Sequence, residues 1–373
     1  MDERVISFGS ILKGRDRKIW NGIERKIADE DPNYFFGFNL QSLTKGTDKE
    51  FFVLHINGEY VGRGVAVLDK SWGKDKKSVG FIDDFMVARE YRDDVDILIQ
   101  ELVSFLKNKG AEEIIVRGGL FPAIETAGYE ELPSFGCPHN PSWYVEIFER
   151  NGFKVVRRFV NYRIKLPELL IEGKSGKEIT DDDGRVIREL NRKNIDEVKK
   201  YVDIMKNASF AHFFGWDTSG IEEDFTPSRV KMYLNNFFVR MIQYKTFCTF
   251  ENGEMVSCTT IHPDYNAVLN NLTKGKRGFI PGIKLLGFPL AVRKTKRYVF
   301  GGTAQVKDKR GKGYGTAKMV WGVYNVLPLL GKVEEFDTGP IVSENLPPIK
   351  MVRSFVGEDG VKEMDYAMMS YKE

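Results

Sequence analysis

The stretch Val306-Lys-Asp-Lys-Arg310-Gly311-Lys312-Gly313-Tyr314-Gly315-Thr316-Ala317 combines alternating glycines with basic side chains. An apolar strand is predicted just before it, from Tyr298 to Val306, and a helix is predicted from Gly315 to about Leu327. Glycines let the backbone approach an anion without an intervening Cβ, and the N–H groups at a helix N-terminus carry partial positive charge. The stretch therefore predicts a phosphate-binding loop between a strand and a helix.

Two common nucleotide-binding motifs fit this loop less well. A dinucleotide fingerprint needs a third glycine three positions after Gly313, where this chain has Thr316. A P-loop needs GxxxxGK followed by Ser or Thr, and the sequence contains no such string. A lone glycine-rich loop can also be an ordinary turn with solvated lysines. The surrounding elements decide between this interpretation and a phosphate-binding loop.

Those surroundings include a duplication. The segments Phe52 to Leu68 and Phe247 to Ile261 are alike, with apolar strands around Asn57-Gly58 and Asn252-Gly253. Asn-Gly between such strands predicts a tight hairpin turn. The two turns lie 195 positions apart, which is too long for a solenoid repeat and is typical of a duplicated domain.

The predicted elements follow one order in both halves, namely helix, hairpin, strand, helix, strand and a last helix. They span 16–28, 52–68, 79–87, 94–109, 113–116 and 142–150 in the first half, and 194–205, 247–261, 298–306, 315–327, 333–337 and a helix ending before Gly357 in the second. A polar stretch without periodicity, from Glu172 to Gly184, predicts the linker. We therefore predict two domains, 1–174 and 175–373.

Composition narrows the functional classes. The 373 residues include 56 Lys and Arg against 53 Asp and Glu, so the near balance gives no strong nucleic-acid signal. Cys137, Cys248 and Cys258 show no CxxC spacing, which predicts neither a disulfide framework nor a metal site. The chain has no signal-like N-terminus and no apolar run of about 18 residues, so we expect a cytoplasmic protein without a membrane segment.

The glycine-rich loop resembles a known signature. Arg310-x-x-Gly313-x-Gly315 is similar to the Arg/Gln-x-x-Gly-x-Gly/Ala motif of the GNAT acyltransferase superfamily. The resemblance implies that acetyl-CoA, or another acyl-CoA, binds through its pyrophosphate to Arg310, Gly311, Lys312, Gly313, Tyr314, Gly315 and Thr316. It also implies that Asn345, in the pair Glu344-Asn345, contacts the pantetheine arm.

Most of the chain resembles tandem GNAT-like proteins of bacteria and archaea. The resemblance in the first half rests on stretches such as Asp31-Pro-Asn-Tyr34, Gly80-Phe-Ile-Asp-Asp84 and Pro138-His-Asn-Pro-Ser-Trp-Tyr144. It implies an α/β (α+β) fold of two tandem GNAT-like domains, each a mixed, mostly antiparallel twisted sheet flanked by helices. In the first half, however, the loop position is occupied by Tyr91-Arg-Asp-Asp-Val-Asp96, whose three carboxylates would repel a pyrophosphate. We therefore predict a degenerate N-terminal copy and a single cofactor site in the C-terminal domain.

The implied reaction is direct attack by an amine on the acyl thioester. A backbone N–H of the strand before the loop, that of Ala304 or Val306, is predicted to polarise the thioester carbonyl. The tyrosine that serves many GNAT enzymes as the acid is replaced here by Arg353. By position alone, Ser343, Asp337 and Tyr366 are the candidates for the catalytic acid.

A covalent cysteine mechanism is not predicted. Cys258 and His262 lie four positions apart on a predicted strand, which separates them by about 13 Å, too far for proton transfer.

Three functions remain open at the level of the sequence. The first is an acyl-CoA-dependent N-acyltransferase acting on a small-molecule or peptide amine. The second is a non-catalytic acyl-CoA-binding sensor or scaffold. The third is a FemAB-like aminoacyl transferase that uses charged tRNA, and it requires a basic groove that the charge balance does not favour. The sequence specifies neither the acceptor nor the oligomeric state.

Overall fold

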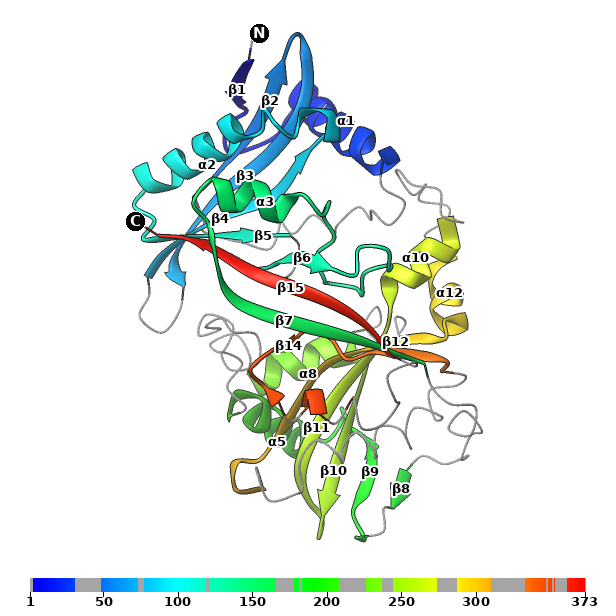
Figure 1. The fold of residues 1–373 in the computed structure, drawn as a ribbon. Helices are drawn as coiled ribbons and strands as arrows, with labels where there is room; N and C mark the ends of the chain where they lie inside the picture. The colour runs from blue at the N-terminus through cyan, green and yellow to red at the C-terminus, as the bar shows by residue number, and fades with distance from the viewer. Residues whose placement is uncertain are drawn as a thin grey trace. The chain divides into compact units, whose positions relative to one another are not determined.

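The structure is a computed structural model (Figure 1). It describes residues 3–30, 48–72, 77–118, 121–165, 178–180, 183–207, 226–236, 244–273, 287–309, 333–346, 348–350, 352 and 361–372. The chain folds into two compact units, unit 1 with residues 1–159, 275–280 and 364–373, and unit 2 with residues 160–274 and 281–363. The predicted split at 174/175 lies outside the described residues. The last strand of the chain belongs to unit 1 from Met364 onward.

Unit 1 is built on a twisted sheet in the order β1-β2-β3-β4-β5-β15. Its strands are β1 (Glu3–Ser7), β2 (Asp48–Ile56), β3 (Glu59–Trp72), β4 (Lys77–Val87), β5 (Glu113–Arg117) and β15 (Val361–Tyr371), with the short β6 (Ile124–Ala127) beside β15. Within the described residues, β4 and β5 pair in parallel, and the other described pairs of this unit are antiparallel. The sheet is therefore mixed and mostly antiparallel, as predicted.

Helices cover both faces of the unit 1 sheet. Adjacent residues of a strand point to opposite faces, and Phe51 and Phe52 on β2 do so here. Phe51 contacts Trp20 of α1 (Gly14–Glu30) with ring centroids 5.1 Å apart. Phe52 belongs to the core formed with α2 (Asp96–Asn108) and α3 (Tyr144–Arg150). The helix α1 thus lies on one face, and α2 and α3 lie on the other.

Unit 2 repeats this plan. Its sheet runs β7-β13-β12-β11-β10-β9-β8, and β12 and β13 form its parallel pair within the described residues. The strands are β7 (Lys154–Lys165, from residue 160), β8 (Glu178–Thr180), β9 (Val186–Glu189), β10 (Lys245–Glu251), β11 (Glu254–Pro263), β12 (Arg297–Gln305), β13 (Glu335–Asp337) and β14 (Ile341–Val342). The helices are α5 (Ile195–Asn207), α8 (Pro227–Asn235), α10 (Tyr265–Thr273) and α12 (Phe288–Lys294).

The two predicted hairpins share their register as well as their turns. Asn57 and Asn252 have φ of 49° and 51°, and the glycines after them also have positive φ, as tight Asn-Gly turns require. A shift of register leaves Val61 as an extra residue on β3 and Val256 as an extra residue on β11. These two bulges lie 195 positions apart, which is also the spacing of the turns. The duplication therefore includes the bulges, which the turn motifs do not predict.

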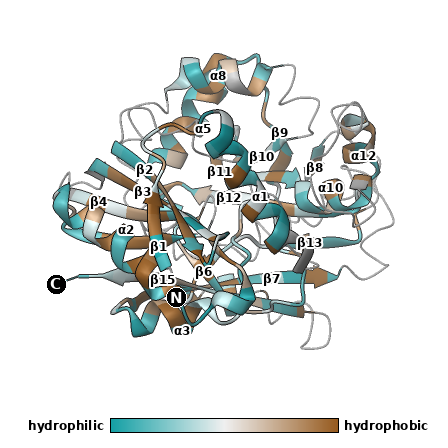
Figure 2. Ribbon diagram, turned by 90° about the horizontal axis from the view of Figure 1, so that it is seen from above, coloured by the Kyte–Doolittle hydropathy of each residue, from teal (hydrophilic) through white to brown (hydrophobic). Residues whose placement is uncertain are grey.

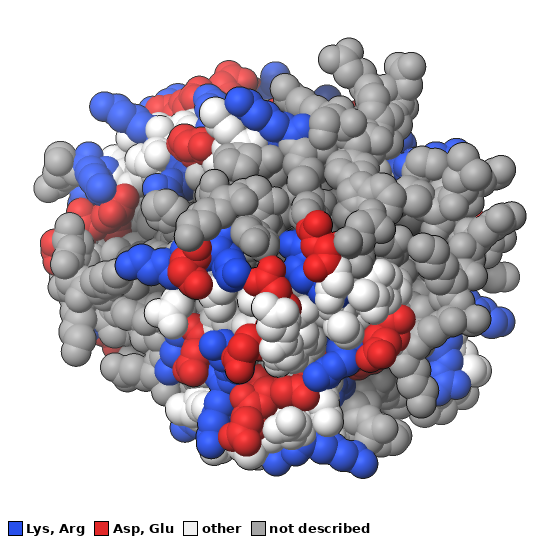
Figure 3. Space-filling model, turned by 90° about the horizontal axis from the view of Figure 1, so that it is seen from below, with Lys and Arg blue, Asp and Glu red and all other residues white. Residues whose placement is uncertain are grey.

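The predicted helices also form. Asp16 to Ala28 lies inside α1, and α2 ends just before Gly110, whose φ of 90° is that of a helix C-cap. In Figure 2 both the strands and helices such as α5 carry polar and apolar residues. On the face in Figure 3, acidic and basic side chains are interspersed. No helix among the described residues is long and apolar enough to cross a membrane.

Candidate functional site

In unit 2 the parallel strands β12 and β13 diverge after a short paired stretch. They pair only at Arg297 with Glu335, Tyr298 with Phe336 and Val299 with Asp337. The chain then leaves β12, since the N–H of Thr338 donates to the carbonyl of Tyr162 on β7 at 2.9 Å. Strand β12 itself continues to Gln305 against β11. Gly339, just after β13, still lies against the carbonyl of Phe300, where an added Cβ would be 2.7 Å from that oxygen. We call the divergence beyond this point, along β12 from Gly301 to Gln305, the unit 2 fork.

The hydrogen-bond register shows which groups of β12 face the fork. The N–H of Val306 donates to Val256 on the β11 side at 3.0 Å. Because backbone groups alternate sides along a strand, the N–H of Ala304 also faces β11, and those of Thr303 and Gln305 face the fork. The 3.1 Å hydrogen bond between the hydroxyls of Thr303 and Thr259 fits this register, since side chains lie closest at non-hydrogen-bonded pairs. The N–H of Val306, predicted as a donor to an acyl carbonyl, therefore donates to Val256 instead, and that of Ala304 faces β11 as well.

Unit 1 contains the same divergence. Its parallel pair β4–β5 runs from Val79 to Asp83, and β4 continues alone past that point to Val87. The N–H of Ala88 donates to Val61 at 2.9 Å, just as that of Val306 donates to Val256. Val87 therefore corresponds to Gln305, and Phe85 corresponds to Thr303.

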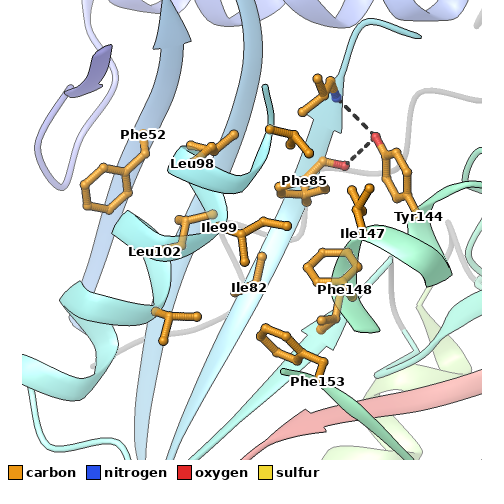
Figure 4. Packing of buried hydrophobic residues seen from close by; sticks show 14 of the residues in the cluster. Phe52, Ile82, Phe85, Leu98, Ile99, Leu102, Tyr144, Ile147, Phe148 and Phe153 are labelled. Atoms are coloured by element: carbon orange, nitrogen blue, oxygen red, sulfur yellow. Dashed lines mark hydrogen bonds between the residues drawn. The ribbon is translucent and has the colours of Figure 1, made fainter. Parts of the chain in front are cut away.

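The chain's own side chains fill the unit 1 fork (Figure 4). The hydroxyl of Tyr144 on α3 accepts from the Val87 N–H at 3.1 Å and donates to the Phe85 carbonyl at 3.5 Å. The ring of Phe85 packs against those of Tyr144 and Phe148, with centroids 5.3 and 5.0 Å away. A tyrosine hydroxyl thus holds the amide that, in unit 2, faces the fork from Gln305.

The loop after β4 is likewise satisfied internally. Asp96, in the first turn of α2, accepts from Arg150 Nε at 2.8 Å and from Asn151 Nδ2 at 2.7 Å. The guanidinium of Arg150 also donates to the carbonyl of Arg92 at 2.9 Å. The N-terminus of α2, where an anion would otherwise be favoured, therefore carries a carboxylate of the protein itself. That the first copy is degenerate stays a prediction.

Solved structures share this architecture. A tandem GNAT protein from the clavulanic acid biosynthesis pathway is 10% identical, with 99% of this chain and 98% of that chain covered and a TM-score of 0.56. A GCN5-related N-acetyltransferase from Sphaerobacter thermophilus is 12% identical, with 98% and 95% covered and a TM-score of 0.54. The chain has the tandem GNAT fold. A glucosamine N-acetyltransferase region of a fungal multi-domain β-N-acetylglucosaminidase is 12% identical, with a TM-score of 0.56 and 99% of this chain covered, but only 38% of that chain.

No protein-family model and no curated protein matches the chain. At 10 to 12% identity the likeness to these structures establishes the fold. The chemistry has to be argued from the residues of the tandem GNAT units themselves.

The predicted phosphate loop, from Arg310 to Thr316, lies outside the described residues and stays a prediction. The described chain reaches the start of it. A short 3-10 turn at Lys307–Lys309 follows β12, as one at Arg89–Tyr91 follows β4. The ammonium of Lys309 pairs with Glu251, so this lysine contributes to the fold of the hairpin. By the spacing of these turns, Arg310 in the sequence corresponds to Arg92.

Asp337 is engaged in a structural role. Both of its carboxylate oxygens accept from Arg163, each at 2.8 Å, and the two side chains are 0% and 3% exposed. Both oxygens of this carboxylate are therefore engaged by one buried guanidinium. Its predicted role as the catalytic acid stays a prediction.

The other predicted residues belong to different units. Tyr366 is fully buried in unit 1, where it pairs with Glu125 on β6, whereas Ser343 belongs to unit 2. Ser343 is half-buried in the turn after β14, and the exposed Asn345 donates its N–H to Val342 at 2.8 Å in the same turn. The roles of Ser343, Tyr366 and Asn345 stay predictions.

Two buried cysteines and a buried histidine lie on the sheet of unit 2. Burial raises the pKa of Cys258 to about 12 and raises the pKa of Cys248 well above its ordinary value. Neither thiol is therefore a thiolate at neutral pH, which agrees with the absence of a predicted cysteine nucleophile. Burial lowers the pKa of His262, so its imidazole is neutral at pH 7. Among the described residues no group of three or more His, Cys, Asp or Glu is arranged to hold a metal ion.

We expect Tyr144→Phe to destabilise unit 1 by about 1–3 kcal/mol, because it leaves the buried Val87 amide without its acceptor. Chemical denaturation followed by near-UV circular dichroism measures the change. Tyr60→Phe, at a half-buried tyrosine of β3, is the matched control and should cost less. Equal stability of the Tyr144 variant and the wild type would contradict the assignment of this hydroxyl to the fork.

Proposed function

We propose that this protein is an acyl-CoA-dependent N-acyltransferase that binds acetyl-CoA, or another acyl-CoA, at the unit 2 fork. The observation that carries the proposal is the difference between the two copies at matched positions. Unit 1 has Phe85 at its fork and Asp96 at its helix start, whereas unit 2 has Thr303 and then the alternating glycines up to Gly315. A small polar residue and a carboxylate-free glycine loop suit an acyl thioester and its pyrophosphate.

The geometry of β12 fits such a ligand. Bound acyl-CoA supplies an activated acyl group as a thioester. The N–H of Thr303 faces the side from which β13 has diverged, where a carbonyl oxygen could accept from it. Such donors stabilise the charge that develops on the carbonyl oxygen when an amine attacks. The loop amides from Gly311 to Gly315 would hold the pyrophosphate, and the acceptor is an amine of a small molecule or peptide.

Acetyl-CoA binding tests the proposal directly. By linkage, acetyl-CoA at about 100 times its dissociation constant should stabilise the protein by about 2.7 kcal/mol, seen as a higher melting temperature. Gly313→Glu should abolish the shift, because a carboxylate would meet the phosphates. Arg310→Glu should weaken the shift strongly, whereas Arg92→Glu, at the matched position of unit 1, should leave it unchanged. If no acyl-CoA shifts the melting temperature, the proposal fails.

A second assay separates the enzyme from the sensor. Release of free thiol from acetyl-CoA in the presence of primary amines supports transfer. Saturable binding without thiol release from any amine would favour the non-catalytic acyl-CoA-binding protein. An aminoacyl transferase that uses charged tRNA would instead bind tRNA with a steep dependence on salt.

A further inference from the structure

Two threonine hydroxyls form a pair at the unit 2 fork. Thr303 on β12 lies directly opposite Thr259 on β11, and their Oγ atoms are 3.1 Å apart, which is a hydrogen-bond distance. Thr259 is 2% exposed, whereas Thr303 is half-buried. Thr303 is therefore the member of the pair that a ligand can reach.

The direction of this hydrogen bond follows from counting donors. Each hydroxyl has one hydrogen to donate, and buried polar groups in proteins are almost always hydrogen-bonded. If Thr303 donated to Thr259, the hydrogen of the buried Thr259 would have no acceptor among the described residues. We therefore expect Thr259 to donate to Thr303, which leaves the hydrogen of Thr303 for a group outside the pair.

The main chain of Thr303 adds a second donor at the same residue. Its N–H faces the fork, because the N–H of Val306 on the same strand donates to Val256 on the opposite side. Unit 1 shows how a polar atom reaches such a strand. The ring of Tyr144 packs against the side chain of Phe85, the counterpart of Thr303, and its hydroxyl accepts from a strand N–H at 3.1 Å. A ligand group at the matched place in unit 2 lies beside the side chain of Thr303 and the main chain of β12.

Unit 1 differs at both members of the pair. By the spacing of the hairpin turns, Thr259 corresponds to Gly64 on β3, just as Thr303 corresponds to Phe85. A Cβ added at Gly64 would lie 2.8 Å from Leu102 Cδ1 and 3.5 Å from Phe85 Cδ2. Glycine at this position therefore makes room for the side chains that fill the unit 1 fork. The two positions differ as a set, with Gly and Phe in unit 1 and two hydroxyls in unit 2.

We propose that the Thr303 hydroxyl donates a hydrogen bond to the carbonyl oxygen of the acyl group, beside the N–H of the same residue, and that Thr259 positions this hydroxyl. The inference rests on the proposed acyltransferase function. When the amine nitrogen bonds to the carbonyl carbon, an electron pair moves onto the carbonyl oxygen, and both donors of Thr303 stabilise that charge. The pair returns to the carbon–oxygen bond as the carbon–sulfur bond breaks. The amine gives one proton to solvent and the thiolate takes one from it, so the products are the amide and the free thiol.

Binding of two CoA derivatives tests the contact without turnover. Acetyl-CoA has the carbonyl oxygen, and the thioether S-ethyl-CoA lacks it. Titration calorimetry on the full chain gives both dissociation constants, and the preference for acetyl-CoA measures what the carbonyl contributes. Thr303→Val keeps the shape and the N–H but removes the hydroxyl, so this preference should fall about 2- to 10-fold, the contribution of one hydrogen bond. Thr303→Ser should keep the wild-type preference. Thr249→Val, at a half-buried threonine of β10, is the matched control and should also keep it.

Turnover separates the roles of the two threonines. With a polyamine, an amino sugar and a peptide as acceptors, Thr303→Val should lower kcat by about 100-fold, while KM for acetyl-CoA rises less than about 10-fold. Thr259→Val should lower kcat less, because the hydroxyl of Thr303 is present but no longer held. The double variant should lose no more than Thr303→Val alone, because Thr259 acts only through Thr303.

The outcomes are distinct. If Thr303→Val keeps the preference for acetyl-CoA, or if Thr303→Ser loses it equally, the hydroxyl does not contact the carbonyl and the inference is wrong, while cofactor binding stands. If the losses of the two single variants add in the double variant, the positioning role of Thr259 is wrong. If the wild type does not bind acetyl-CoA, the proposed function fails and the inference fails with it.

Discussion

Replacing Arg163 with leucine should destabilise unit 2 by about 3–5 kcal/mol, one of the two largest effects expected from a single substitution in this protein. The guanidinium donates to both oxygens of Asp337, and both side chains are almost wholly buried. Removing it leaves a buried carboxylate without its partner. The resulting loss in the free energy of unfolding is far larger than the net contribution of the ion pair itself. Urea denaturation of the purified protein measures the loss.

The double variant Arg163→Met with Asp337→Leu is the matched control. Removing both charges leaves apolar side chains of similar size, so most of the stability lost in Arg163→Leu should return. Arg163→Lys should fall between the two, because lysine keeps the charge but cannot reproduce the two-pronged contact. A loss below about 1 kcal/mol in Arg163→Leu would contradict the buried pair.

The position of this pair links stability to the site. Asp337 is the last residue of β13 in register with β12, and Thr338 after it pairs with Tyr162 on β7 through its N–H and its hydroxyl. The ion pair therefore fixes the point at which β13 leaves β12. We infer that Asp337 supports the fork through this ion pair.

Local signals in the sequence predicted the elements well. Asn57-Gly58 and Asn252-Gly253 specify tight turns by their backbone preferences alone, and Gly110 ends α2 for the same reason. The shared spacing of these signals also predicted the duplication and the tandem fold. These features depend on neighbours within a few residues, so they are visible without the tertiary structure.

The candidate site could not be predicted in the same way, because it depends on contacts between residues that are far apart in the sequence. Which amides of β12 face the fork is decided by hydrogen bonds to β11, and an error of one residue exchanges Ala304 for Thr303. The partner of Asp337 lies 174 positions away, and Tyr144 reaches the amide of a residue 57 positions before it. The bulge at Gly301 also appears only once the strands are paired.

The second large effect should come from Phe148→Ala, which we expect to destabilise unit 1 by about 3–5 kcal/mol. Phe148 is 0% exposed, and its ring lies between those of Phe85 and Phe153 at 5.0 and 5.3 Å. Its removal opens a cavity where the aromatic side chains fill the unit 1 fork (Figure 4). Val156→Ala, at an exposed residue of β7 in the same unit, should change stability by less than about 0.5 kcal/mol.

This variant also tests whether acetyl-CoA binds unit 2 and not unit 1. If unit 1 is sealed by its own side chains, loosening them should lower its stability without changing the rise in melting temperature that acetyl-CoA gives through unit 2. If the Phe148→Ala protein is still folded but no longer responds to acetyl-CoA, the proposal that the cofactor binds unit 2 alone is wrong. A variant as stable as the wild type would show that the aromatic cluster does not support the fork of unit 1.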